Sequence, residues 1–489
     1  MSLSSRLERG PNLPTRSHKT RFLPKAITGV LVAAAAFWVA WKDFAIADKW
    51  QQGQLKLWAS YTEAADALLT RGKLDDALTA RRHALLVAER LVSADAGNRQ
   101  WLNYAAVSHI NIAEVLLSQG KRDEALKAYR KNLVILERLA DGNHSDSRSQ
   151  ADLMSSYERL GDLLAIQGRL REALDAYRKA QIAADRLVDI EPRNPARWGD
   201  LGAACMKVGN VLLEQANLDE ALAQYRDGLA IAKRLATFLD AGNTRWQRDL
   251  LLASQKVGDA LVVQGKLDEA LKSYYDSLGI AERLAAADRG NTTWQGDLSL
   301  SYVKLGNLLV VRGSLDDALT AYRASLAIVE QLAVADRDNS GWQHDLSASQ
   351  IKIGNVLVAQ GKLDDALKLY RDSLAITKRL AIGNRSRRRW QRELSDSYIR
   401  IGNVMVAQSN LDEALKAYKE SAAIAEQLAA GERNNAQRQR ELIASYEKVA
   451  NVLMTQGRVR DALNIHRANL AIAERLTTVG RREDLAPRS

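Results

Sequence analysis

Cationic side chains recur along this sequence at a fixed distance from amide or acidic side chains. A Lys or Arg stands three residues before an Asn or Asp, as Lys304 stands before Asn307. Residues i and i+3 lie on the same face of a helix, so each pair offers a positive charge and a hydrogen-bonding group to one side. The candidate partner-binding residues are Lys207, Asn210, Lys256, Asp259, Lys304, Asn307, Lys352, Asn355, Arg400, Asn403, Lys448 and Asn451.

Two interpretations of these pairs stay open. They can form a ladder of hydrogen bonds between adjacent helices, which is a structural role. They can also line a groove that presents amides to a peptide backbone and cations to the carboxylates of that peptide. Asn is a poor residue for a helix interior, so its repeated use needs a reason other than helix propensity.

Motifs that would indicate an enzyme are missing from the sequence. We find no Gly-x4-Gly-Lys-Ser/Thr, His-Glu-x-x-His or Gly-x-Ser-x-Gly pattern, and the six histidines do not recur in register. The single cysteine, Cys205, excludes an internal disulfide and is expected to be a buried structural residue. We therefore expect no catalysis, no cofactor and no metal site.

The pairs belong to a long internal repeat. When the chain is aligned on a turn residue, the spacing is 48 residues except for one interval of 49. Periods of 20–50 residues are typical of solenoids. The nine turn residues are Gly72, Gly120, Gly168, Ala216, Gly265, Gly313, Gly361, Ser409 and Gly457.

Apolar residues hold fixed places in every repeat. Alanine follows each turn residue by five positions, and an aromatic residue usually follows by nine, as Ala318 and Tyr322 follow Gly313. Seven residues before the turn stands Gly or Ala, as at Gly306. A helical Gly is costly, which predicts a close approach of two helices, with the alanine of the second helix opposite the Gly. Each repeat is thus predicted to be two antiparallel helices.

The ends of the predicted helices carry further signals. Acidic residues open the second helix, where they complement its dipole and its free N–H groups. Five tryptophans begin first helices, and we expect them to be wedges between neighbouring repeats. They are Trp101, Trp246, Trp294, Trp342 and Trp390.

This pattern resembles the tetratricopeptide repeat over roughly residues 50–479. The resemblance is carried by the spacing of Leu305-Gly306, Leu309, Gly313, Ala318 and Tyr322. The period of 48 exceeds the usual 34, and the proline that often ends the second helix is missing, so longer helices are expected. The resemblance implies an all-α, right-handed superhelical solenoid of nine antiparallel helix pairs. It also implies a concave face of first helices that binds proteins or peptides, without catalytic residues.

The N-terminal segment predicts a membrane anchor. Residues 1–25 are basic and contain three prolines, which predicts a disordered cytoplasmic tail, and residues 26–41 carry no charge. We expect one transmembrane helix within residues 26–47, with the repeats exported and a disordered tail at residues 480–489. The alternative is a signal peptide cleaved after Ala47, because Ala45-Ile46-Ala47 fits the small-x-small pattern.

The charge distribution bears on possible partners. The net charge is +11, but residues 1–47 hold a surplus of five, so the repeats are near balance. Nucleic acid is therefore not expected as a partner. We predict a membrane-anchored protein-interaction scaffold. The first alternative is a structural spacer at the cell envelope. A nucleic-acid-binding helical array is a second, less favoured alternative. The last apolar face predicts docking or self-association at the C-terminal end.

Overall fold

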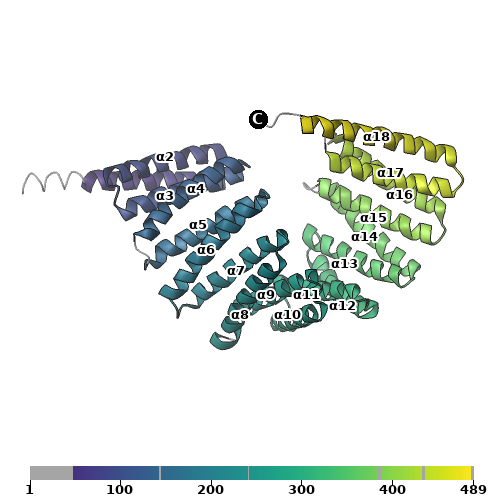
Figure 1. Ribbon diagram of the computed structural model, residues 1–489, viewed down its shortest axis with the longest axis horizontal. Helices are drawn as coiled ribbons and strands as arrows, with labels where there is room; N and C mark the ends of the chain where they lie inside the picture. The colour runs from purple at the N-terminus through teal and green to yellow at the C-terminus, as the bar shows by residue number, and fades with distance from the viewer. Residues whose placement is uncertain (1–47, 143–144, 241, 384–386, 432–434, 486–489) are drawn as a thin grey trace, which may run out of the picture. The chain divides into compact units, whose positions relative to one another are not determined.

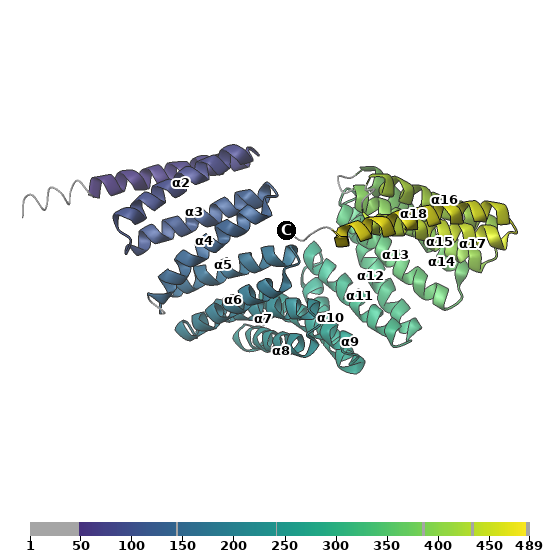
Figure 2. The same cartoon turned by 45° about the horizontal axis from the view of Figure 1, so that its top comes forward.

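The computed structural model describes residues 48–142, 145–240, 242–383, 387–431 and 435–485. Apart from turns and connecting loops, these residues are helical, and they confirm the expected nine antiparallel helix pairs. The chain divides into two compact parts, an N-terminal part that ends at Ile166 and a C-terminal part that begins at Gln167. Figures 1 and 2 show successive antiparallel helices within each part. No helix in the described part of the chain is long and apolar enough to cross a membrane. The predicted anchor at 26–47 lies outside the described residues and stays a prediction.

First and second helices alternate along the chain. The first described helix covers residues 48–70. The remaining first helices are α3 (Arg99–Ser118), α5 (Ser147–Ile166), α7 (Pro195–Glu214), α9 (Thr244–Val263), α11 (Thr292–Val311), α13 (Ser340–Ala359), α15 (Arg387–Ala407) and α17 (Ala436–Thr455). The second helices are α2 (Leu74–Ala94), α4 (Arg122–Asp141), α6 (Leu170–Ile190), α8 (Leu218–Arg234), α10 (Leu267–Ala287), α12 (Leu315–Ala335), α14 (Leu363–Gly383), α16 (Leu411–Gly431) and α18 (Val459–Leu485).

The turns inside eight of the repeats are Schellman motifs. In the sixth repeat the N–H of Gly313 donates to Val310 O and that of Ser314 to Leu309 O, at 3.0 and 2.8 Å. The turn residue takes a positive φ in every repeat, which glycine adopts without strain. Ala216 and Ser409 adopt the same left-handed conformation at φ 59°. The alignment of the repeats on the turn residue is therefore confirmed.

Ser409→Gly is expected to stabilise the protein by about 0.5–1 kcal/mol, because glycine relieves the strain of a side chain at positive φ. Gly313→Ala should destabilise it by a similar amount. Urea denaturation followed by circular dichroism measures both. An unchanged midpoint for both variants would contradict the assignment of left-handed strain to this turn.

The close approach of the two helices is confirmed, but the partner predicted for the glycine was wrong. A Cβ built at Gly306 would lie 2.6 Å from Cε1 of Tyr322, and Gly354 meets Tyr370 in the same way at 2.5 Å. The aromatic ring of the second helix thus covers the glycine. Ala318 is itself fully buried. Its side chain is too short to be the feature that demands a glycine, whereas the tyrosine ring spans the distance between the helices.

The single interval of 49 residues is absorbed by a π-helical turn. The second helix of the fourth repeat ends in η1 (Leu235–Leu239), and the next first helix begins at Thr244. A π turn accommodates one extra residue without breaking the helix. Leu235 keeps its place in the core, with 2% of its surface exposed. The inserted residue therefore leaves the register of the following repeats intact.

Tryptophans at the start of first helices pack against the preceding repeat. Trp390 is buried in a cluster with Ile376, Leu380 and Ala381 of α14. Trp294 packs on Ile280 and other core residues of the repeat before it. The prediction that these residues are wedges between repeats is confirmed at both sites. Cys205 is buried, as expected.

Candidate functional site: a ladder of amides along the first helices

The amide residues of the first helices bond to the tyrosines that cover the glycines. Tyr322 Oη donates to Asn307 Oδ1 at 2.8 Å. Tyr370 donates to Asn355 and Tyr418 to Asn403, both at 2.7 Å. The same bond joins Tyr225 to Asn210 and Tyr274 to Asp259. Each repeat of this region thus fixes its amide or acid from its own second helix.

The cations bond to the preceding repeat. Lys352 Nζ donates to Asn307 Oδ1 at 2.9 Å, and Lys304 Nζ to Asp259 Oδ1 at 2.7 Å. Arg400 bonds to Asn355 at 3.4 Å and Lys448 to Asn403 at 3.3 Å. We call each set of tyrosine, amide or acid, and following cation a rung. The interpretation as a hydrogen-bonded ladder between adjacent first helices is therefore confirmed from Asp259 to Lys448.

The ladder does not include every predicted site residue. Within the described residues, no hydrogen bond joins Lys256 to Asn210. Lys207 lies over the ring of Tyr177, 5.5 Å from its centroid, as the ladder cation Lys352 lies over Tyr322 at 5.7 Å. Asn451 is exposed on the last first helix. Related pairs occur in the N-terminal part, where Arg159 bonds to Glu114 and the buried Arg81 replaces the tyrosine and bonds to Asp66.

The rungs determine which atoms of each amide remain available. Lys and Arg only donate hydrogen bonds, so the atom of Asn307 that faces Lys352 must be Oδ1. Tyr322 donates to the same oxygen. The Nδ2 groups of Asn307, Asn355 and Asn403 find no acceptor among the described residues, and all three side chains are exposed. The ladder therefore displays a row of N–H donors.

Hollows and an apolar row accompany these donors. Asn355 lines a hollow of about 340 Å³ with Ile351 and Arg400, and a second of about 210 Å³ with Val358 and Asn403. Three residues beyond each amide stands an exposed apolar residue. These are Val310, Val358, Val406 and Met454, at 37–47% exposure. We call them the apolar row.

The cations and tyrosines of the rungs differ from freely exposed side chains in their pKa values. Burial and the nearby Arg400 lower the pKa of Lys352. Burial raises the pKa of Tyr322 to about 12, so its hydroxyl stays protonated and donates. Because the cations already bond to amides or acids of the preceding repeat, they are poorly placed to receive the carboxylates of a peptide. That half of the groove hypothesis is not favoured by the geometry.

Sequence reasoning missed two further sets of contacts between repeats. An acid near the start of the first helices stands sixteen residues before the turn residue, as at Asp249, Asp297 and Asp345. Burial raises the pKa values of Asp249 and Asp345, and Asp297 accepts a bond from Arg248 of the preceding repeat. A glutamine before the turn donates to an acid that opens the preceding second helix, as Gln360 does to Asp316 at 2.9 Å. Both sets recur at a constant position, which was the available signal. The acids we assigned to the helix dipole therefore also bind the next repeat.

The ladder contact can be tested by a double-mutant cycle on Lys304 and Asp259, using Lys304→Met and Asp259→Asn. Both side chains are mostly shielded, at 21% and 29% exposure. A coupling free energy of about 1 kcal/mol is expected from a charge-assisted bond in this setting. The exposed pair Lys416–Glu413 should show no measurable coupling, because solvent screens it. Equal coupling in the two pairs would contradict the ladder's structural role.

These features define first a class and then a family. The class is that of helical repeat proteins, built from antiparallel helix pairs with a close glycine–tyrosine contact. Two tetratricopeptide repeat profiles match the sequence, one over residues 345–427 and the other over residues 107–146, 201–236 and 442–477. These segments of the chain therefore match the tetratricopeptide repeat, as the sequence pattern predicted.

Three solved structures align with this chain at low sequence identity. The apo form of RapI is 12% identical over 86% of this chain and 99% of its own, with a TM-score of 0.49. A signal transduction ATPase with a tetratricopeptide repeat sensor from Pyrococcus horikoshii is 14% identical over 87% and 55%, with a TM-score of 0.48. A Rap protein complexed with Competence and Sporulation Factor is 12% identical over 87% and 99%, with a TM-score of 0.38. No curated protein matches the sequence.

Proposed function

We propose that this protein is a membrane-anchored interaction scaffold that binds an extended peptide segment of a partner protein along its first helices. The peptide lies across α11, α13 and α15. Its backbone carbonyls accept hydrogen bonds from Nδ2 of Asn307, Asn355 and Asn403, and its apolar side chains contact the apolar row. Residues 26–41 supply the anchor, with the N-terminus cytoplasmic and the repeats exported.

The observation that carries this proposal is the orientation of the three amides. Tyrosine and cation both occupy Oδ1, so two N–H donors per amide are left toward solvent. A peptide backbone is rich in carbonyl acceptors that match such a row. Asp259 shows that the ladder can be built without an amide, because it bonds to Tyr274 and Lys304 as Asn307 bonds to Tyr322 and Lys352. The asparagines therefore add donors that the ladder itself does not need.

A photo-cross-linking experiment tests this assignment. A benzoylphenylalanine placed at Val358, in the apolar row, is expected to cross-link a partner in intact cells. Benzoylphenylalanine placed at Ile382 of α14 should not cross-link the partner, because Ile382 is 88% exposed and lies off the groove. Equal cross-linking from both positions would contradict the groove as the binding surface and favour the spacer hypothesis.

Topology is tested separately. Reporter fusions to the two ends should report a cytoplasmic N-terminus and an exported C-terminus. The opposite result would overturn the proposed localisation and leave the groove proposal unaffected.

A further inference from the structure

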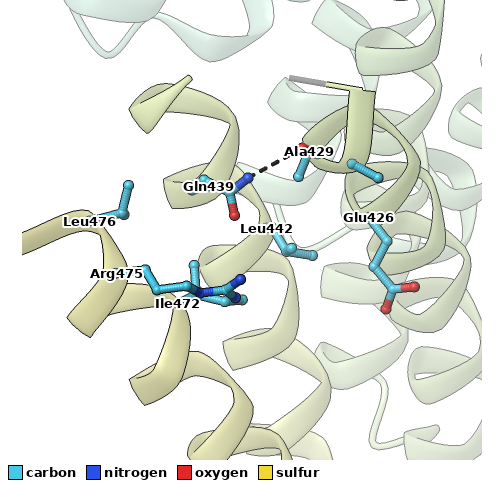
Figure 3. Close-up of a pocket in the computed structure, with 8 residues that line it drawn as sticks. Glu426, Ala429, Gln439, Leu442, Ile472, Arg475 and Leu476 are labelled. Atoms are coloured by element: carbon cyan, nitrogen blue, oxygen red, sulfur yellow. Dashed lines mark hydrogen bonds between the residues drawn. The ribbon is translucent and has the colours of Figure 1, made fainter. Parts of the chain in front are cut away.

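The ninth repeat contains a hollow whose lining repeats the lining around the buried tryptophans. The hollow has a volume of about 410 Å³ and lies among α16, α17 and α18. Figure 3 shows Leu442, Ile472 and Leu476 at its wall. We call the space among these three residues the end slot. The side chains of Glu426, Gln439 and Arg475 lie at its border, together with Ala429 and Ala430.

The position of each wall residue within the repeat identifies what fits there. Ile472 and Leu476 follow Gly457 by the same intervals at which Ile376 and Leu380 follow Gly361. Leu442 likewise corresponds to Leu346. In the seventh repeat, Ile376, Leu380 and Leu346 form one cluster with Trp390, which comes from the next repeat.

A second repeat shows the same arrangement. In the fifth repeat, Ile280, Leu284 and Leu250 occupy the corresponding positions and cluster with Trp294. The end slot is therefore built like an indole-binding site. In the ninth repeat the described residues place no tryptophan in it.

The apolar surface beside the end slot is uncovered as well. Leu463 of α18 is 49% exposed, whereas the equivalent Leu367 and Leu415 are 7% and 6% exposed because the next repeat covers them. Leu470 of the same helix is 59% exposed. The site is thus larger than the slot and extends along one face of α18.

Two polar contacts recur at internal junctions that carry a tryptophan. The next residue is a glutamine whose Nε2 donates to a carbonyl oxygen of the preceding second helix, as Gln295 does to Ala285 at 3.0 Å. At the junctions of Trp294 and Trp390, the third residue after the tryptophan is an acid that meets a basic side chain of the preceding first helix; at the junction of Trp342 that position of the preceding helix is Gly296. Arg248 donates to Asp297 at 2.5 Å, and His344 pairs with Glu393 at 3.0 Å.

The ninth repeat presents the basic half of this contact. Arg440 holds the position of Arg248 and His344, is exposed, and makes no ion pair with any described residue. The described junctions therefore specify the missing half: a helix that begins Asn-x-x-Trp-Gln-x-Asp/Glu. The initial Asn caps the helix, as Asn291 does when its Oδ1 accepts from the Trp294 N–H.

We propose that the end slot binds the N-terminal turn of a partner helix with this sequence, with its indole against Ile472 and its acid paired with Arg440. The occupant is a different protein and not a second copy of this chain. At the four equivalent positions the first repeat has Gly53, Gln54, Leu55 and Lys56. It supplies no indole there, and Lys56 would face Arg440.

A binding measurement on the full-length chain in detergent micelles tests the proposal. The probe is a fluorescein-labelled peptide with the sequence of residues 291–303, followed by fluorescence anisotropy. Replacing its tryptophan by alanine is expected to weaken binding at least tenfold. Leu476→Glu in the protein should do the same, whereas Ile382→Glu, an exposed apolar residue elsewhere, should leave binding unchanged.

A charge exchange keeps the test independent of folding. Arg440→Glu should weaken binding of the peptide at least threefold. A peptide carrying Asp297→Arg should restore binding to this variant. Equal binding of the tryptophan and alanine peptides would overturn the proposal. The proposal would also be overturned if neither Leu476→Glu nor Arg440→Glu changed peptide binding. A dimer of the chain that Leu476→Glu dissociates would overturn it as well.

Discussion

Gly306→Ala is expected to destabilise the C-terminal part by about 1–3 kcal/mol, although alanine is the better helix former. The added Cβ would lie 2.6 Å from the ring of Tyr322, and that ring is held by Asn307 on one side and buried by the core on the other. Urea denaturation followed by circular dichroism measures the loss in the free energy of unfolding.

A second helical glycine provides the matched control. Gly279 lies within α10, and a Cβ there would meet only the end of Arg283, at 3.9 Å. Gly279→Ala should therefore stabilise the protein by about 0.5–1 kcal/mol. If Gly306→Ala stabilised the protein equally, the glycine–tyrosine contact would not be what selects glycine.

Acid is expected to destabilise the N-terminal part through His109, whose side chain is 7% exposed in α3. Burial, aided by the charge of Lys131, lowers the pKa of His109 to about 4. The unfolded chain binds a proton near pH 6.5, whereas the folded chain does so only near pH 4. Stability is therefore lost as the pH falls from 6.5 to 4, by up to about 3 kcal/mol.

Denaturation of the wild type and of His109→Leu between pH 7.5 and 4 measures this effect. The variant should lose less stability over that range, because its buried side chain does not titrate. Identical pH profiles for the two proteins would show that another group causes the acid sensitivity.

Most of the repeat architecture could be predicted from the sequence because it rests on local chemistry. A residue at positive φ favours glycine, and apolar residues at helical spacing mark a buried face. The partner of Gly306 could not be predicted in this way. Which residue packs on Gly306 depends on how far each side chain reaches between the two helices. That distance cannot be read from the spacing of residues along the chain.

The candidate site was predicted only in part, for a similar reason. Lys304 and Asn307 do lie on one helix, but each bonds to a different neighbour: Lys304 reaches back to Asp259, and Asn307 receives Lys352. The stagger between adjacent helices decides this pairing. The ladder is compatible with the amide half of the groove hypothesis, because it uses Oδ1 of each amide and leaves Nδ2 without an acceptor among the described residues.

Docking at the C-terminal end was predicted from its apolar face, but the shape of the end slot was not, although its signal was present. Tryptophan, glutamine and an acid recur together at residues 246–249, 294–297, 342–345 and 390–393. The sequence shows that these three residues recur at the same spacing. Only the packing around Trp294 and Trp390 shows that these two sets bind the preceding repeat, and that packing is the basis of the partner proposed for the end slot.

The most direct test of the proposed function is partner capture by Asn355→Asp. Aspartate can accept the bonds from Tyr370 and Arg400, as Asp259 does from Tyr274 and Lys304, but it has no N–H to donate. We expect at least a tenfold loss of the cross-link from Val358, with the free energy of unfolding unchanged or increased. Asn410→Asp, the same change at a turn outside the groove, should leave the cross-link intact. An undiminished cross-link in Asn355→Asp would contradict the account and reduce the amides to a purely structural ladder.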